Sequence, residues 1–288
     1  MTLKEVYDYG TEQLKEAGIE YPSVDAFYLL EFAAGIDKTK YLRYKDYPVQ
    51  EEYFNQYKEL IEKRKTRIPY QYITGRADFG GLTFEVNESV LIPRLDTEVL
   101  LEQVLRLIPF QANVLDMCTG SGCLGIAIKR HRPDARVTLA DISEDALKIA
   151  ELNLKHNYLE AASKADSDLR VRVVKTDLFK KLTGEKYKII VSNPPYVTEA
   201  EYETLAPEVK DHEPKLALTA GEDGLDIYRR LIKEAPRYLE KEGSLALEIG
   251  CSQAEAVTGL MESAGFTNIR VIKDLAGLDR VVIGQMGE

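Results

Sequence analysis

The chain has 288 residues, of which 44% are hydrophobic and 30% are charged, and its formal net charge is −10. This length is enough for a large α/β domain and a smaller second domain, and the hydrophobic content is that of a globular protein with buried cores. The acidic charge removes the basic field on which binders of duplex DNA or RNA usually rely, so it favours a protein or small-molecule substrate.

The cysteines, the histidines and the N-terminal segment exclude further classes of protein. The three cysteines and three histidines show neither the spacing of a metal site nor that of a disulfide framework, so we expect no metal and a reducing compartment. The N-terminus lacks the apolar core of a signal peptide, and no stretch approaches the roughly 18 apolar residues of a membrane span. We therefore expect a cytoplasmic protein that does not contact a membrane.

Residues 1–67 follow a helical pattern of apolar residues that no strand pattern interrupts. Helix-breaking residues divide this stretch at 18–22, at Gly35 and at Pro48. Each resulting helix has one apolar stripe to bury, so we predict a small bundle of three or four short helices. Such an all-helical domain is too small to be a catalytic domain by itself.

Residues 68–90 have a different pattern from the helices before them. The stretch 79–86 has the residues of a short hairpin with two glycines at its bend, so we predict a linker that carries this hairpin. An apolar helix follows and reaches Leu107. Asp96 or Thr97 is available as its N-cap.

Residues 91–288 make up the predicted second domain, in which strand and helix patterns alternate. This alternation predicts an α/β fold with a doubly wound, mostly parallel sheet of seven strands. The last two strand patterns have no helix between them, which predicts an antiparallel hairpin at the end of the sheet. The predicted strands are 113–116, 136–141, 170–175, 187–192, 243–249, 267–272 and 280–285, and two later helices are predicted near 224–239 and 252–264.

A glycine-rich loop follows the first strand of this sheet. Gly120, Gly122 and Gly125 have the spacing of a nucleotide-binding turn, and Asp141 ends the next strand. Glycines let a ligand approach the backbone, and an acid at that place accepts hydrogen bonds from both ribose hydroxyls. The pattern fits a dinucleotide, and it equally fits S-adenosylmethionine, which offers a carboxylate and a ribose.

Two further strand ends carry polar residues. Asp177 follows the third strand, where an acid accepts from the exocyclic amine of adenine, although Asp in such a place often only caps a turn. Asn193 follows the fourth strand. Because the carboxyl ends of parallel strands lie at one edge of a sheet, we expect the glycine loop, Asp141, Asp177 and Asn193 to meet there.

The tetrapeptide Asn193-Pro194-Pro195-Tyr196 carries the signal for the reaction. The Asn side-chain carbonyl and a Pro-Pro backbone without donors offer two hydrogen-bond acceptors, and an aromatic face follows. This array suits a planar NH2 group and, beside a cofactor loop, indicates methyl transfer to its nitrogen. Adenine, guanine and glutamine all carry such a group, and Asn-Pro and Pro-Pro are also common in plain turns.

Several segments of the chain together resemble one known family, the release-factor glutamine methyltransferases (PrmC/HemK), across nearly the whole length. The tetrapeptide is shared with enzymes that methylate amino groups of DNA and RNA, whereas the Ile92-Pro93-Arg94 segment and the helical N-terminal domain are more particular. The segments are Pro69-x-x-Tyr72-x-x-Gly75, Val90-Leu91-Ile92-Pro93-Arg94 with Thr97-Glu98, Leu115-Asp116 with Thr119-Gly120-Ser121-Gly122, Asn193-Pro194-Pro195-Tyr196, and Glu248-Ile249-Gly250 with Gln253.

The resemblance implies a function for each domain. The fold would be a Rossmann-like class I methyltransferase, and the enzyme would methylate the side-chain amide (N5) of the Gln in the Gly-Gly-Gln motif of class 1 peptide-chain release factors. S-adenosyl-L-methionine would be the methyl donor and S-adenosyl-L-homocysteine the product. The helical domain, 1–67, would dock the release factor. We expect a monomer that holds no nucleic acid stably.

The resemblance also implies the residues of the site. It implies catalytic roles for Asn193, Pro194 and Tyr196, and substrate contacts from Asn193, Pro194, Pro195, Tyr196 and Arg94. The implied cofactor-binding residues are Cys118, Thr119, Gly120, Ser121, Gly122, Asp141, Asp177, Leu178 and Asn193. Some family members have an aromatic residue in place of Leu178, so the sequence leaves open whether Leu178 or Phe179 covers the adenine.

Other functions account for fewer of these residues. A methyltransferase of adenine or guanine amino groups in DNA or RNA is the main alternative, and the acidic charge and the lack of an evident base-recognition domain argue against it. An NAD-dependent oxidoreductase would explain the glycine loop but would leave Asn193–Tyr196 and Arg94 unused. A binding module without activity would leave all the strand-end motifs unexplained.

Overall fold

The computed structural model describes residues 1–159 and 170–287. The chain divides into two compact units. The helical unit consists of Met1–Arg76 and Ala206–His212, and the sheet unit consists of Ala77–Leu205 and Glu213–Glu288. The range 68–90, predicted as a linker, contains a short helix and a two-stranded hairpin.

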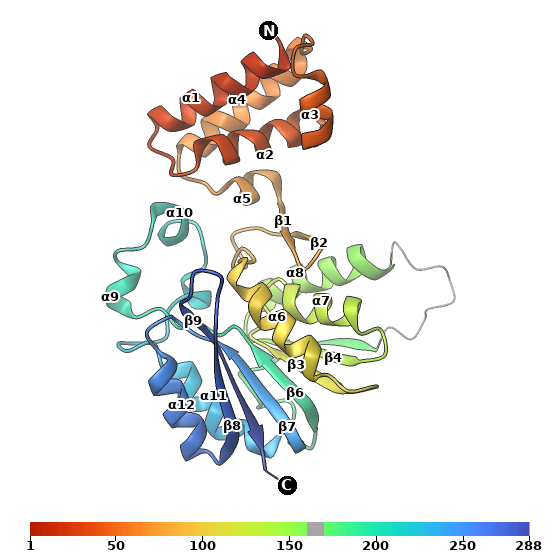
Figure 1. Ribbon diagram of the computed structural model, residues 1–288, viewed down its shortest axis with the longest axis vertical. Helices are drawn as coiled ribbons and strands as arrows, with labels where there is room; N and C mark the ends of the chain where they lie inside the picture. Colours follow the sequence, from red (N-terminus) through yellow and green to blue (C-terminus); the bar gives the residue numbers. More distant parts are fainter. Residues whose placement is uncertain (160–169, 288) are drawn as a thin grey trace. The chain divides into compact units, whose positions relative to one another are not determined.

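The helical unit buries a single apolar core. Leu14, Leu29, Leu30 and Ile61 from three of its helices are at most 1% exposed. Gly10 lies where a Cβ atom would be 1.8 Å from the hydroxyl of Tyr57, so the missing side chain lets two helices pack closely. The helices are α1 Leu3–Glu16, α2 Pro22–Ala34, α3 Lys38–Tyr44, α4 Glu51–Lys65, α5 Tyr70–Thr74 and α10 Pro207–Lys210 (Figure 1). The predicted N-terminal helical region is therefore confirmed.

A buried ionic cluster joins the segment 206–212 to the rest of the helical unit. Arg64 Nε lies 2.6 Å from Asp25 Oδ2, and its NH2 lies 2.9 Å from Glu208 Oε1. Arg67 contacts the same Glu208 oxygen at 3.1 Å. Burial raises the pKa of Asp25, and the Arg64 guanidinium opposes that rise. These ion pairs link residues far apart in sequence, so periodicity alone gives no sign that 206–212 belongs to this unit.

The sheet unit holds a seven-stranded sheet in the order β5-β4-β3-β6-β7-β9-β8. Its first five strands in this order pair in parallel, and β9 pairs antiparallel with both β7 and β8. The predicted doubly wound, mostly parallel sheet with a terminal hairpin is confirmed. Its strands are β3 Asn113–Met117, β4 Arg136–Asp141, β5 Val171–Lys175, β6 Tyr187–Ser192, β7 Leu239–Glu248, β8 Phe266–Lys273 and β9 Asp279–Met286.

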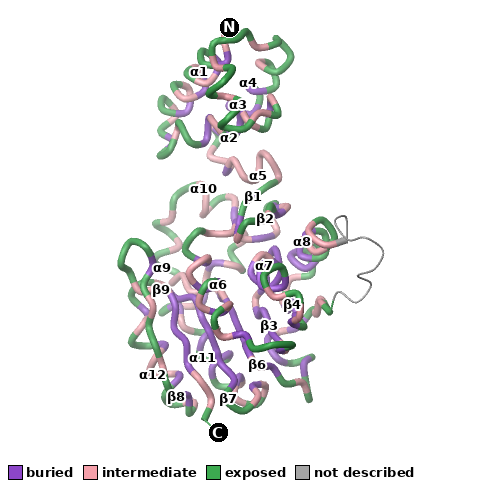
Figure 2. Tube along the Cα trace, turned by 45° about the vertical axis from the view of Figure 1, so that its right-hand side comes forward, coloured by how far each residue is buried: buried purple, intermediate pink, exposed green. Residues whose placement is uncertain are grey.

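Helices cover both faces of this sheet, because side chains of a strand alternate between its faces. In β3, Val114 packs with one group of helices, whereas Leu115 and Met117 pack with the other. The central strands are accordingly the most buried part of the unit (Figure 2). The first group is α6 Asp96–Leu107, α7 Cys123–His131 and α8 Glu144–Leu154, and the second is α11 Asp226–Glu234 and α12 Ala254–Ser263.

The remaining elements are short. A hairpin of β1 Arg76–Phe79 and β2 Leu82–Glu85 matches the predicted one with glycines at its bend, and α9 Glu199–Tyr202 begins with a capping box formed by Thr198 and Glu201. A π-helical turn covers Lys155–Leu159, and 3₁₀ turns cover Lys215–Ala217 and Ala235–Arg237. Within 1–159 and 170–287, the structure has no helix with both the length and the apolar character that crossing a bilayer requires.

The structure corrects two local predictions. Helix α6 begins at Asp96 after Leu95, and no side chain caps it, so neither Asp96 nor Thr97 is the N-cap. Thr97 is instead 3% exposed and lines the cavity described below, where its hydroxyl accepts from the Asn193 side chain. Helix α11 is shorter than the predicted 224–239, because a 3₁₀ turn replaces its last part at Pro236.

We predict that Gly125→Ala lowers the free energy of unfolding by about 1–3 kcal/mol. A Cβ atom there would lie 2.2 Å from Leu139 Cδ2 and 2.9 Å from Asp116 Oδ2, so the core would have to shift. Gly259→Ala is the matched control, since no atom lies within 4 Å of its Cβ position in α12. That variant should be more stable than wild type by roughly 0.5–1 kcal/mol. Equilibrium urea unfolding measures both, and equal stability of the two variants would contradict the packing argument.

Candidate active site

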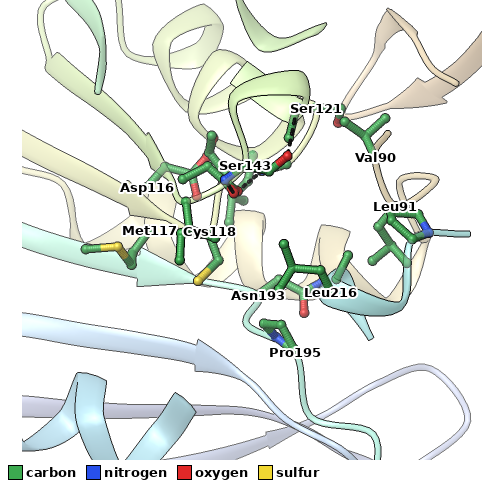
Figure 3. Close-up of a pocket in the computed structure, with 18 of the residues that line it drawn as sticks. Val90, Leu91, Asp116, Met117, Cys118, Ser121, Ser143, Asn193, Pro195 and Leu216 are labelled. Carbon is green, nitrogen blue, oxygen red and sulfur yellow. Dashed lines mark hydrogen bonds between the residues drawn. The ribbon is translucent and has the colours of Figure 1, made fainter. Parts of the chain in front are cut away.

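A cavity of about 260 Å³ lies in the sheet unit at the carboxyl ends of β3, β4 and β6. The sequence-predicted residues that line it are Arg94, Cys118, Thr119, Gly120, Ser121, Asp141, Asp177, Leu178, Asn193 and Pro195. Gly122, Pro194 and Tyr196 are not among its lining residues. Figure 3 shows Asn193, Pro195 and Leu216 on one side of the cavity, with Cys118, Ser121 and Ser143 opposite them.

The glycine-rich loop between β3 and α7 is held by one buried carboxylate. Asp116 Oδ2 accepts hydrogen bonds from Thr119 Oγ1 at 2.5 Å and from the backbone N–H of Gly125 at 2.9 Å. Gly120 and Gly122 have φ values of +54° and +81°, which favour glycine. The backbone of the loop therefore turns sharply at the cavity wall and leaves no side chain there at Gly120.

Asp116 itself is 1% exposed. Burial raises the pKa of its carboxyl from 3.8 to about 7, and the nearby charge of Asp141 acts in the same direction. The hydrogen bonds from Thr119 and Gly125 oppose this rise. The carboxylate that shapes the loop is thus more easily protonated than an exposed aspartate.

Asp141 connects the end of β4 to the glycine loop. Its Oδ2 accepts from the Gly120 N–H and its Oδ1 from the Ser143 N–H, both at 2.9 Å. Burial raises the pKa of this carboxyl, and these backbone donors oppose the rise. Each carboxylate oxygen retains lone pairs for a ligand in the cavity that Asp141 lines.

Asp177 and its neighbours differ in their access to the cavity. The Asp177 carboxylate binds Lys180 Nζ at 2.7 Å and Arg230 NH2 at 2.6 Å, and these cations lower its pKa. Leu178, at φ +48°, lines the cavity. Phe179 is fully buried and stacks on Tyr238, with 4.4 Å between the ring centroids. Of the two candidates for covering a ligand there, only Leu178 faces the cavity.

Asn193 directly follows β6, and a residue of α6 holds its side chain in place. Its Nδ2 donates to Thr97 Oγ1 on α6 at 3.2 Å. The preceding Ser192 donates to the carbonyl of Met117 on β3 at 2.5 Å, which ties the two strand ends together. Since the NH2 group of Asn193 binds Thr97, the carbonyl oxygen of that amide is left for the cavity.

The backbone of Tyr196 is held by the Glu248–Gln253 segment. Gln253 Nε2 donates to the Tyr196 carbonyl at 3.0 Å, while Gln253 Oε1 accepts from the Gly250 N–H at 2.9 Å. The Tyr196 hydroxyl donates to Glu248 Oε1 at 3.4 Å. Tyr196 lines a second cavity, of about 490 Å³, instead of the first. Its role as an aromatic surface for the substrate stays a prediction.

Comparison with known proteins now gives the family. Residues 5–75 match the PrmC N-terminal domain, and residues 94–210 match the methyltransferase small domain. A release factor glutamine methyltransferase of Clostridium acetobutylicum is 38% identical over 291 residues, spanning 100% of this chain and 99% of that relative. A protein of the same name from Geobacter sulfurreducens is 38% identical over 99% of this chain and 97% of its own. The chain belongs to the release factor glutamine methyltransferase family.

The fold agrees with this assignment. The crystal structure of a methyltransferase from Pyrococcus furiosus matches with a TM-score of 0.56 at 19% identity, covering 79% of this chain and 100% of that one. At this identity the match shows the class I methyltransferase fold alone. The resemblance inferred from the sequence is confirmed, and the protein is a methyltransferase.

The family's Ile92-Pro93-Arg94 segment contributes an arginine to the cavity. Arg94 NH2 lies 2.5 Å from Glu213 Oε1, and the Glu213 side chain is 1% exposed. Burial raises the pKa of Glu213, and the Arg94 charge opposes it. Sequence reasoning missed Glu213, because 119 positions separate it from Arg94.

Other cavity residues also escaped the sequence analysis. Ile142 and Ser143 directly follow Asp141, so their position after a strand end was an available signal. Leu216 lines the cavity although it is 61% exposed, and no motif marks it. Among residues 1–159 and 170–287, no group of three or more His, Cys, Asp or Glu side chains is arranged to hold a metal ion.

We predict that the free energy of unfolding of the wild type falls between pH 5 and pH 8, and that Asp116→Asn makes this fall smaller. The pKa of Asp116 is higher in the folded protein than in the unfolded chain, so the folded state holds this proton more tightly. Its contribution therefore lowers the free energy of unfolding as pH rises from about 4 to about 7. Asn keeps the acceptor for Thr119 and Gly125 but does not titrate.

Urea unfolding at pH 5 and pH 8 measures this effect. Wild type should lose on the order of 3 kcal/mol more than Asp116→Asn over this range. Asp145→Asn is the control: the pKa of Asp145 is lowered by its hydrogen bond with Lys148, so its titration lies below pH 5. A wild-type pH dependence equal to that of Asp116→Asn would contradict the prediction.

Proposed function

We propose that this enzyme transfers a methyl group to the side-chain amide nitrogen (N5) of the Gln in the Gly-Gly-Gln motif of class 1 peptide-chain release factors. One observation supports this most: the Asn193 amide and the glycine loop line the same cavity. The family and the names of the relatives support glutamine as the acceptor. The net charge of −10 favours a protein acceptor over a nucleic acid.

The residues around the cavity fit S-adenosyl-L-methionine. The Asp141 carboxylate has free lone pairs for ribose hydroxyls, and the side chains of Ile142 and Leu178 offer apolar surface for an adenine ring. The backbone of Gly120 is open to a ligand, because no atom lies within 4 Å of its Cβ position. When bound, this cofactor supplies an electrophilic sulfonium methyl group and leaves as S-adenosyl-L-homocysteine.

Asp177 has a smaller part in this proposal than the sequence suggested. Lys180 and Arg230 already bind one carboxylate oxygen each. An adenine amine would have to share those oxygens, since each has a second lone pair. We therefore assign the apolar cover of the ring to Leu178 and only a supporting role to Asp177.

The tetrapeptide prepares the substrate amide for attack. An amide nitrogen is a poor nucleophile, because its lone pair is delocalised into its carbonyl. We assign one N–H group to the side-chain carbonyl of Asn193, which lines the cavity, and the other, on the sequence motif alone, to the backbone carbonyl of Pro194. Two such acceptors hold the nitrogen in place and favour developing positive charge on it. Neither Pro194 nor Pro195 has an N–H that would compete for these acceptors. As the N–C bond forms, the bond from the methyl carbon to sulfur breaks and its electron pair stays on sulfur. The positively charged nitrogen then loses one proton to water.

The remaining assignments concern the partner. We assign Arg94, which pairs with Glu213 and lines the cavity, to contact with the release factor. The helical domain, 1–67, is assigned to docking the release factor, 68–90 to the linker and 91–288 to catalysis. We also propose a cytoplasmic monomer that forms no stable complex with nucleic acid.

The acceptor is tested by incubating the enzyme with labelled S-adenosylmethionine and, separately, purified class 1 release factor, duplex DNA and rRNA. Mass mapping should find one added methyl group on the Gln of the Gly-Gly-Gln motif. The two nucleic acids should remain unlabelled. Label on DNA or rRNA but not on the release-factor Gln would overturn the proposed function in favour of a nucleic-acid amino-methyltransferase.

Asn193→Ala should lower kcat by about 10²–10³-fold, because it removes an acceptor that acts on the transition state. Affinity for S-adenosylmethionine, measured by calorimetry, should change by less than about threefold. Asn157→Ala is the control, since within 1–159 and 170–287 the Asn157 side chain donates to the backbone carbonyls of Thr83 and Asn153, away from the cavity residues. Wild-type kcat in Asn193→Ala would rule out the role assigned to this amide.

A further inference from the structure

Two buried polar side chains beside the tetrapeptide, Thr97 and Glu248, have no role yet in methyl transfer, and Thr97 also lines the cavity. Thr97 Oγ1 accepts from Asn193 Nδ2 at 3.2 Å, and Thr97 is 3% exposed. Glu248, at the end of β7, is 1% exposed and accepts from the Tyr196 hydroxyl at 3.4 Å. Thr97 therefore contacts the first residue of the tetrapeptide, and Glu248 contacts the last.

The Glu248 carboxylate has an unused acceptor. Its Oε2 is buried and has no hydrogen-bond partner among the described residues. A buried polar atom without a partner is destabilising, so its retention calls for an explanation. Its carboxylate is nevertheless close enough to the Thr97 hydroxyl for this hydroxyl to lower its pKa.

The groups that act on the Glu248 carboxylate come from α6, β9 and the tetrapeptide. Burial raises the pKa of Glu248 to about 7, and Asp96 at the start of α6 raises it as well. The Thr97 hydroxyl, the Arg280 guanidinium on β9 and the Tyr196 hydroxyl oppose this rise.

Glu248 and its neighbour Arg280 are themselves held in place. Tyr228 on α11 donates to the backbone carbonyl of Glu248 at 2.6 Å. Arg280 NH2 lies 3.1 Å from Asp274 Oδ2 and 3.3 Å from Asp96 Oδ2, so much of its charge is already balanced.

The direction of the hydrogen bonds decides which end of the Asn193 amide faces the cavity. A threonine hydroxyl has one proton and two lone pairs. Because Thr97 accepts from Asn193, its own proton needs another acceptor. An ionised Glu248 can only accept, so it draws that proton and keeps a Thr97 lone pair directed at Asn193. With the NH2 group of Asn193 held there, its carbonyl faces the cavity.

We propose that Thr97 and Glu248 are positioning residues for methyl transfer: Glu248 accepts the Thr97 proton, and Thr97 thereby turns the carbonyl oxygen of Asn193 toward the NH2 group of the substrate. This inference rests on the proposed function of Asn193. If the Asn193 amide were reversed, its NH2 group would face the NH2 group of the substrate, and neither group would have an acceptor. Through Tyr196, the same carboxylate also fixes the other end of the tetrapeptide.

Thr97→Val tests the role of the Thr97 hydroxyl, because valine keeps the shape of threonine but cannot accept or donate a hydrogen bond. Its kcat should fall about tenfold or more at pH 8, with KM for the acceptor and affinity for S-adenosylmethionine within about threefold of wild type. Thr97→Ser restores a hydroxyl and should recover most of the activity. Thr258→Val is the matched control: it removes a buried hydroxyl on α12 that has no hydrogen-bond partner in the described part of the chain, and it should leave kcat unchanged.

The pH dependence separates positioning from a general loss of structure. Protonated Glu248 donates to Thr97 instead of accepting, so wild type should lose its advantage as pH falls. The ratio of wild-type kcat to Thr97→Val kcat should be about ten at pH 8 and should shrink toward one at pH 6. Glu248→Gln should likewise lower kcat at pH 8 and show the same narrowing ratio.

The outcomes distinguish this inference from the function on which it rests. Full activity of Thr97→Val beside an inactive Asn193→Ala would overturn the positioning role and leave the proposed function intact. A ratio that does not change with pH, or no recovery in Thr97→Ser, would also overturn it. Wild-type enzyme that labels no release-factor Gln would instead overturn the proposed function.

Discussion

The parallel pairing of β3 with both β4 and β6 is the constraint on which the site depends. Met117 at the end of β3 is in register with Ala140 on one side and with Ser192 on the other. The next residues in each case leave the sheet at the same level, as the glycine loop, Asp141 and Asn193. Because the chain adds β4 on one side of β3 and β6 on the other, the strand order reverses at β3, which is where doubly wound folds bind their ligands.

This edge of the sheet carries buried carboxylates that are compensated mainly by neutral donors. Asp116 and Asp141 accept from backbone N–H groups and from Thr119, and no cation pairs with either carboxylate among the described residues. The hydrogen bonds offset only part of the cost of burial, so the pKa values of both groups remain raised. The glycine loop is held in place without a basic side chain that would repel a cationic ligand.

The local parts of this arrangement could be predicted from the sequence, and the long-range parts could not. The glycine loop, Asp141 and Asn193 each follow an apolar strand directly, so pattern and spacing located them. The partners of those residues come from distant elements: Thr97 is 96 positions from Asn193, and Glu248 is 52 positions from Tyr196. Periodicity gives no information on such pairs. For the same reason the sequence offers Asp96 or Thr97 as a helix cap, because their place before an apolar helix fits that role equally well.

The contacts also explain why the tetrapeptide needs this surrounding structure. Asn193-Pro194-Pro195-Tyr196 supplies acceptors, but an asparagine amide presents an acceptor or a donor depending on its rotation, and the two orientations have nearly the same shape. The orientation of the Asn193 amide is therefore set by the partner of its NH2 group, which is Thr97. The hydroxyl of Thr97 can also donate or accept, until an acceptor fixes the position of its proton. An ionised Glu248 can only accept. The buried, ionised Glu248 at the end of β7 thus sets the direction of the hydrogen bond between Thr97 and Asn193.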